Sequence, residues 1–124
     1  RLPHDALNAL HALTLGAAPR PRTWVMGLMV ELGWRDSQNR RYTNDTVREA
    51  LALLATQAWI AEASTKPGFW QVHPLVLSAV YRHLLDTHPG PALQPALVRH
   101  AHFGGLGGER SYGSEEEEGI SHLA

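Results

Sequence analysis

Three arginines stand close together just ahead of a predicted helix start. Residues 35–42 read RDSQNRRY, so Arg35, Arg40 and Arg41 share one short polar segment, and the run TND follows at 43–45. Guanidinium groups bind phosphate and carboxylate oxygens through several N–H donors at once. The free N–H groups of a helix start also attract anions. The chemistry indicated is binding of a polyanion, and the alternative is that the arginines are ordinary solvated loop residues.

The other residue types that carry chemistry form no catalytic or cofactor-binding pattern. Cysteine is absent, which excludes disulfides and thiolate metal sites. Among the eight histidines, neither His4 with His11 nor His100 with His102 comes with a convincing set of carboxylates. The six serines lie in no nucleophile elbow, and GGLGG at 104–108 lacks the lysine of a phosphate loop. We therefore predict no catalytic residue, no metal and no cofactor, and expect a non-catalytic chain or a non-catalytic domain of a larger enzyme.

Length and charge narrow the class of protein further. The 124 residues are 44% hydrophobic, which suits one ordinary domain with a real core, and no apolar run reaches the roughly 18–20 residues of a membrane helix. The net charge of −1 combines a basic start, a neutral middle and an acidic end. Nucleic-acid-binding domains are usually more basic. Because cysteine is absent and the chain begins with Arg1 rather than Met, we expect a cytoplasmic piece of a longer protein.

Apolar residues recur at helical spacing on both sides of the arginine segment. A first helix is predicted over 5–15, with Gly16 positioned to end it, and AAPRPR at 17–22 is too rich in proline to continue it. A second helix is predicted from Thr23, as its N-cap, to a stop at Gly33.

The clearest helix follows the arginine segment. Thr43, Asn44 and Asp45 are three candidate N-caps in a row. A single apolar stripe follows at i, i+3, i+4, i+7 and i+11, made by Val47, Ala50, Leu51, Leu54 and Ala58.

Beyond that helix the pattern changes to short strands. Residues 59–63 and 69–73 contain strand-forming types, and Pro67-Gly68 between them suits the centre of a type II turn. A β-hairpin is therefore predicted, and a fourth helix is predicted over 75–85.

The end of the chain has a different composition. A weaker helical pattern at 93–102 predicts a C-terminal helical extension within 89–103. Residues 104–124 are rich in Gly, Ser and Glu and predict a flexible linker, because so polar a segment buries too little surface to offset the entropy of ordering it.

The order of these elements resembles the winged-helix superfamily. The resemblance rests on TNDTVREALALLATQAWIAEA (43–63) followed by KPGFWQVHP (66–74), where a capped third helix runs into an apolar step and then a turn between two strands. It covers about residues 5–86. It implies an α+β, mostly helical fold in which residues 1–88 form a winged helix with a β-hairpin wing, extended by further C-terminal helices.

DNA-binding winged helices insert the third helix into the major groove and hold the phosphate backbone with the wing and helix starts. The resemblance therefore implies a non-catalytic module for double-stranded DNA, acting as a targeting or regulatory segment of a larger protein. Arg20 and Arg22, ahead of the second helix, are candidates to enlarge the basic cluster. The residues that the resemblance assigns to DNA are Arg35, Arg40, Arg41 and Arg48 on phosphates, Asn44 and Thr46 near the groove, and Lys66 on the wing.

One departure from the DNA-binding pattern keeps a second hypothesis open. The face of the third helix opposite its apolar stripe carries Asp45 and Glu49, with only Arg48 as a nearby cation. Acidic groups repel phosphate, so the alternative is a winged helix that contacts another protein or the rest of its own parent chain. Phe69 and Trp70 are the candidate partner-binding residues, together with the fourth helix, because neighbours in a strand point to opposite faces.

Overall fold

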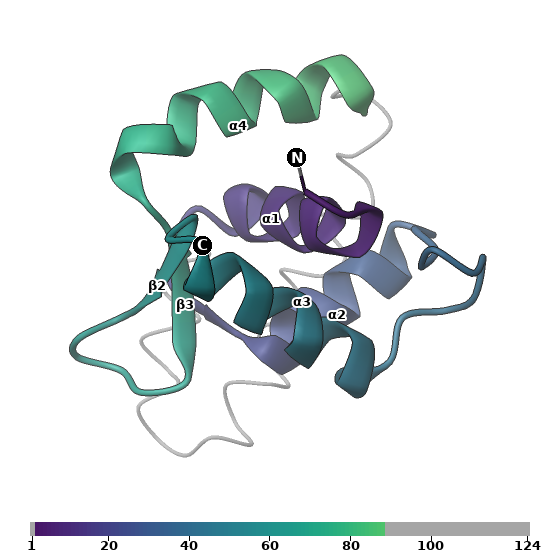
Figure 1. The fold of residues 1–124 in the computed structure, drawn as a ribbon, viewed down its shortest axis with the longest axis horizontal. Helices are drawn as coiled ribbons and strands as arrows, with labels where there is room; N and C mark the ends of the chain where they lie inside the picture. Colours follow the sequence, from purple (N-terminus) through teal and green to yellow (C-terminus); the bar gives the residue numbers. More distant parts are fainter. Residues whose placement is uncertain (1, 89–124) are drawn as a thin grey trace.

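Four helices and a small antiparallel sheet make up residues 2–88, the part of the chain that the computed structural model describes (Figure 1). The predicted α+β, mostly helical class is confirmed. The helices are α1 (His4–Gly16), α2 (Arg22–Glu31), α3 (Asn44–Thr56) and α4 (Pro74–Thr87), and the strands are β1 (Arg20–Pro21), β2 (Ile60–Glu62) and β3 (Phe69–Val72). The extension predicted over 89–103 and the linker predicted over 104–124 lie outside the described residues, and the domain boundary at residue 88 stays a prediction.

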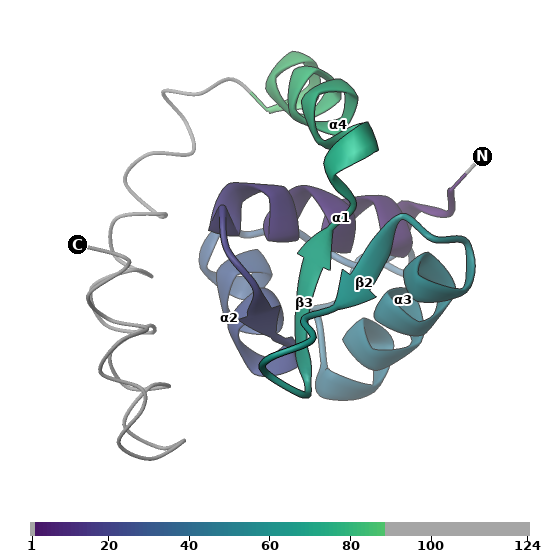
Figure 2. The ribbon, with the colours of Figure 1, turned by 90° about the vertical axis from the view of Figure 1, so that its left-hand side faces the viewer.

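Helix α1 runs through the middle of this part of the chain. In both ribbon views it lies between α4 on one side and the pair α2 and α3 on the other (Figures 1 and 2). Nine of its 13 residues are buried, and these include the polar side chains of Asn8, His11 and Thr14. A helix surrounded in this way is apolar around most of its circumference and must satisfy its polar groups internally.

The observed helix ends agree with the sequence prediction at Thr43 and differ from it at Thr23 and Gly16. Of the three candidate N-caps, Thr43 is the one that caps α3, since its hydroxyl accepts a hydrogen bond from the backbone N–H of Thr46 at 3.3 Å. Thr23 was predicted to cap α2, but Pro21 occupies that position and Thr23 lies inside the helix. Proline fixes φ near the value that a helix start needs, so α2 begins earlier than the hydroxyl pattern indicates.

The end of α1 corrects the predicted role of Gly16. The residue in the left-handed conformation is Ala17, with φ of 57°, while Gly16 is still helical. A Cβ on Gly16 would come within 2.9 Å of the Arg20 side chain and 3.0 Å of the Trp24 ring. Glycine is needed at position 16 because two side chains pack against its backbone.

The sheet contains a strand that the sequence did not predict. Its order is β1-β3-β2, all antiparallel, so β1 from the proline-rich segment pairs with the hairpin strand β3. Two residues show no alternating pattern, and an edge strand tolerates the proline at Pro21. The β2–β3 hairpin is confirmed, and Gly68 in its turn has the positive φ, 83°, that the predicted turn requires.

One core joins all of these elements. Leu10 of α1, Leu28 and Met29 of α2, and Leu54 of α3 are among its fully buried side chains. Val80 of α4 belongs to the same cluster. None of the helices within residues 2–88 has the length and apolar character needed to cross a membrane.

Replacing a core leucine tests this packing directly. Leu54 has 0% relative exposure, so Leu54→Ala should lower the free energy of unfolding by about 2–5 kcal/mol, through lost transfer energy and the cavity left behind. Urea unfolding followed by circular dichroism measures the change. Leu75 of α4 is 87% exposed, so the same chemical change at Leu75 should stay within about 0.5 kcal/mol of wild type. Equal losses in the two variants would contradict the assigned core.

Candidate nucleic-acid interface

The arginine-bearing loop, residues 35–42, is folded around the buried carboxylate of Asp36. One oxygen, Oδ1, accepts hydrogen bonds from the backbone N–H groups of Gln38 at 2.9 Å and Arg40 at 2.8 Å. The backbone N–H of Asp36 donates to the carbonyl of Arg40 at 2.8 Å, and Arg35 pairs with Arg41 as an isolated antiparallel bridge. The loop is therefore a tight hairpin-like turn with defined geometry, not an open solvated connection.

Hydrogen bonding sets the charge state of this carboxylate. The backbone hydrogen bond from Arg40 is the largest influence that lowers the pKa of Asp36 below its ordinary value, and the bond from Gln38 and the charge of Arg40 act in the same direction. Desolvation opposes them without reversing the shift. Asp36 is thus a stable anion that organises a loop of cations.

A second carboxylate fastens the loop to α1. Asp5 accepts hydrogen bonds from the backbone N–H of Ser37 at 3.0 Å and from the hydroxyl of Tyr42 at 2.9 Å. The same hydroxyl accepts a hydrogen bond from the buried Asn8 amide at 2.9 Å. Burial raises the pKa of Tyr42, so its hydroxyl stays protonated and keeps donating. Both ends of the loop are held against the N-terminal half of α1.

The loop brings three of the predicted residues together. Arg35, Arg40 and Arg41 are all exposed, and the Arg40 side chain keeps 68% of its surface open although its Nε lies 3.7 Å from an Asp36 oxygen. Within residues 2–88, neither Arg35 nor Arg41 forms an ion pair. Their guanidinium groups can therefore meet an incoming anion without first breaking a strong internal contact.

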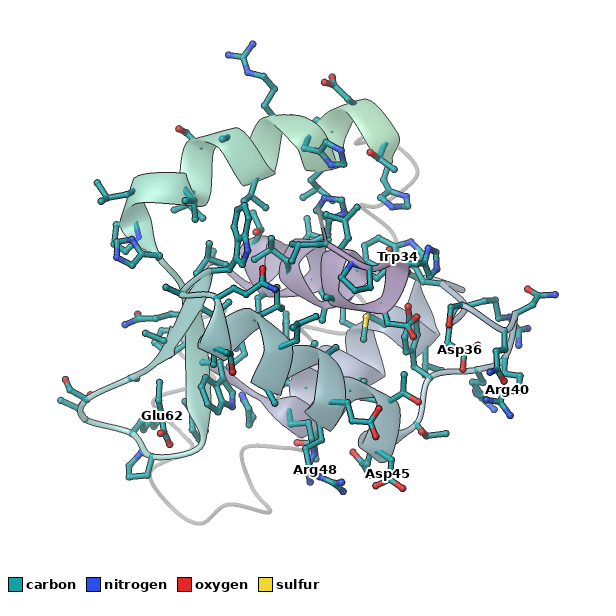
Figure 3. All side chains as sticks on the ribbon, in the orientation of Figure 1. Trp34, Asp36, Arg40, Asp45, Arg48 and Glu62 are labelled. Atoms are coloured by element: carbon teal, nitrogen blue, oxygen red, sulfur yellow. The ribbon has the colours of Figure 1, made fainter. Side chains whose placement is uncertain are left out.

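The start of α3 continues this surface but carries charges of both signs. Figure 3 shows Asp45 and Arg48 together in the first turns of α3, and their side chains form an ion pair at 2.6 Å. Asn44 is exposed beside them, whereas Thr46 is half-buried and its hydroxyl lies 3.1 Å from that of Thr43. Glu49 is exposed one residue beyond Arg48. The predicted outward face of α3 does face solvent, with its acids included.

The β2–β3 hairpin lies at the far end of the same surface. The loop of residues 35–42 and the β2–β3 turn lie at opposite ends of α3 (Figure 1), and Figure 3 shows Arg40 and Glu62 far apart with Arg48 between them. Lys66 in the turn sits over the ring of Phe69, 4.6 Å from its centre, and Glu62 accepts a hydrogen bond from the backbone of Gly68. The candidate cations form a row along one edge, not a single cluster.

The two aromatic residues proposed for partner contact are both only half-buried. Trp70 packs against the core from β3, and Phe69 lies under the Lys66 ammonium group. Along the backbone, β1 pairs with β3 and sets Arg20 opposite Trp70. The large exposed apolar side chains are instead on α4: Leu75, Leu77, Tyr81 and Leu85.

Arg20 does not belong to the basic surface that was predicted. It is 5% exposed, its guanidinium donates twice to the carbonyl of Gly16, and it stacks 4.3 Å from the centre of the Trp24 ring. Arg22 is half-buried at the start of α2. Both positions looked like loop cations in the sequence, and only the packing of α1 against α2 assigns Arg20 a structural role.

No family model, curated protein or solved structure matches this chain. The function must therefore be inferred from the geometry of residues 2–88 and from the residue types that its surface presents.

Removing the Asp36 carboxylate should loosen the arginine loop while the core stays folded. In Asp36→Ala, the amide protons of Gln38 and Arg40 lose their acceptor and should exchange with solvent faster. Because the pKa of Asp36 is lowered by folding, its contribution is present above the ordinary aspartate pKa of about 4 and is lost as the pH falls through the folded-state pKa. Amide exchange followed by NMR measures both effects.

Asp45→Ala is the matched control. It removes an equal charge from an exposed ion pair nine positions along the chain, and it should leave the Gln38 and Arg40 amides unchanged. Unaltered exchange of these two amides in Asp36→Ala would refute the assigned role of the carboxylate.

Proposed function

We propose that residues 1–88 are a winged-helix domain that binds double-stranded DNA without catalysis, as a targeting or regulatory segment of a larger protein. The element order supports the fold: a strand between the first two helices joins the hairpin, and α3 lies next to both the arginine loop and the hairpin turn. A fold hosts many functions, so the DNA proposal depends on the surface itself.

The observation that carries the proposal is the exposed start of α3 beside a rigid loop of exposed arginines. The first N–H groups of a helix have no partner within the helix, and together with the helix dipole they favour a bound phosphate. Arg35, Arg40 and Arg41 would neutralise neighbouring phosphates from the loop. Arg48 would bind a further phosphate from α3, Asn44 and Thr46 would lie near the groove, and Lys66 would hold the backbone from the hairpin turn.

The acids on this edge lower the affinity but do not exclude binding. The Arg48–Asp45 pair is exposed on both sides, and an exposed ion pair contributes about 0–1 kcal/mol. A phosphate can therefore replace Asp45 as the partner of Arg48 at small cost. Contacts of this kind read the backbone and not the bases, so binding should be weak, strongly salt-dependent and tolerant of sequence.

Neutralising Asp45 should strengthen DNA binding. Asp45→Asn frees Arg48 and removes one repulsive charge, an effect of about 1 kcal/mol, or roughly fivefold in Kd. Fluorescence anisotropy of a labelled duplex at low and moderate salt measures the change, which should shrink as salt increases. Arg40→Glu with Arg41→Glu should abolish binding at both salt concentrations.

Asp86→Asn is the charge-matched control for this experiment. Asp86 belongs to α4, which lies on the far side of α1 from α3 (Figures 1 and 2). The control should therefore bind DNA like wild type. If neither wild type nor Asp45→Asn binds duplex even at low salt, the DNA proposal is wrong.

The alternative function is protein contact, and the surface of α4 favours it. Leu75, Leu77, Tyr81 and Leu85 are exposed on one helix. Leu77 and Tyr81 also line an open groove of about 660 Å³ between α4, β3 and the end of α1. An apolar helix of another protein, or of the rest of the parent chain, fits such a surface. Absence of DNA binding at low salt would make this the leading function.

A further inference from the structure

A cluster of aromatic rings lies where the C-terminal part of α4 meets α1. His11 of α1 is fully buried, and its Nε2 lies 3.1 Å from Nδ1 of His83 on α4. The ring of His88, just past the end of α4, meets that of His11 edge-on at 5.9 Å. Trp34 stacks on His88 at 4.4 Å, and Figure 3 shows it beneath the C-terminal end of α4. Residues from α1, α4 and the α2–α3 connection therefore meet at one point.

The histidine pair is one of a small number of contacts between α4 and the rest of the described chain. Only Val80 and Leu84 of α4 are buried, while the rest of the helix is exposed or half-buried. The His11–His83 hydrogen bond is the polar link between the two helices. Val76 packs on the core in part, and the ring of His88 contacts Trp34 and His11. An element with so few buried side chains belongs to the low-stability end of a fold.

Charge makes this link sensitive to protons. In the neutral pair, one imidazole nitrogen donates and the other accepts. Once both rings are protonated, two cations face each other at hydrogen-bonding distance. The second nitrogen of His11, Nδ1, is buried with no hydrogen-bond partner, so a proton there has nothing to stabilise it. Burial first, and then the charges of His83 and His88, lower the pKa of His11 to about 4.

Acidic groups nearby do not compensate for these charges. Within residues 2–88 no histidine ring forms an ion pair with a carboxylate. Asp5 of α1 is engaged by Ser37 and Tyr42. The other titratable or charged groups on the elements around the cluster are His4 of α1, bonded to the Arg35 carbonyl, Arg35 and Asp36 of the loop, and the exposed Arg82 and Asp86 of α4.

We propose that the His11–His83 pair is a pH-dependent latch, which holds α4 on α1 at neutral pH and releases it in acid. Release leaves α1, α2, α3 and the sheet packed on one another and uncovers Val80, Leu84 and the α1 surface beneath them. The pKa of His88 is also lowered, by burial first and then by the charge of His83, so protonation of His88 favours the open state as well. The latch involves no residue assigned to DNA and does not depend on that function.

Hydrogen–deuterium exchange on the full chain between pH 7.5 and 4.5 tests the latch. Corrected for intrinsic exchange rates, protection of α4 should fall as the pH decreases, by up to about tenfold per pH unit for each proton taken up on opening. Protection of α3 should stay constant over the same range. Constant protection of α4, or equal loss in α3 and α4, would overturn the proposal.

Variants separate the latch from general acid sensitivity. His11→Leu removes the buried base, so protection of α4 should depend on pH less steeply than in wild type. His83→Leu replaces an exposed residue and removes both the hydrogen bond and the neighbouring charge. Protection of α4 should therefore be lower than in wild type at neutral pH, and the further loss in acid should be smaller. Arg82→Leu, at the adjacent exposed position, is the matched control and should behave like wild type. The latch is wrong if His83→Leu and Arg82→Leu respond to acid equally.

Discussion

The fold depends on a central helix that is buried on nearly every side and yet carries polar side chains. A buried donor or acceptor without a partner costs about 1–3 kcal/mol, and the buried polar side chains of Asn8, His11 and Thr14 on α1 find partners within the molecule, except for Nδ1 of His11. Thr14 turns back to the carbonyl of Leu10 in its own helix. Asn8 and His11 reach other elements instead: Asn8 bonds to Tyr42 at the end of the arginine loop, and His11 bonds to His83 of α4. The two surfaces discussed for function are thus both attached to α1 through its polar groups.

These attachments leave the described part of the chain with two unlike faces. On one side of α1, the loop of residues 35–42, the start of α3 and the hairpin turn present a row of mixed charges with arginine in excess at the loop end. On the other side, α4 presents apolar side chains and little charge. The first face is the one proposed for a polyanion, and the second is the one proposed for an apolar partner. Because α1 separates them, one module could use both faces without competition between its ligands.

The elements that could be predicted are those set by neighbours in the chain. The stripe of Val47, Ala50, Leu51 and Leu54 predicted α3 and its buried face, since a 3.6-residue period is a local property. The Thr43 cap and the Gly68 turn followed from local hydrogen bonding and from the φ that glycine allows. Strand β1 could not be predicted, because two residues become a strand only when β3 is beside them. The role of Gly16 was missed for the same reason, since Arg20 and Trp24 reach it only after α2 has packed.

The sequence by itself determined that this chain has capped amphipathic helices, a hairpin and a loop dense in arginine. Each of these features depends on the types and spacing of residues that are close together in the chain. Tertiary structure alone decided which cations face solvent: Arg40 remains exposed, whereas Arg20 stacks on Trp24 in the interior. It also decided which histidines meet, since His11 and His83 are 72 positions apart. Burial and long-range contacts depend on how the helices and strands pack against each other. The spacing of residues within a short segment therefore does not specify the environment that sets a side chain's charge, partner and role.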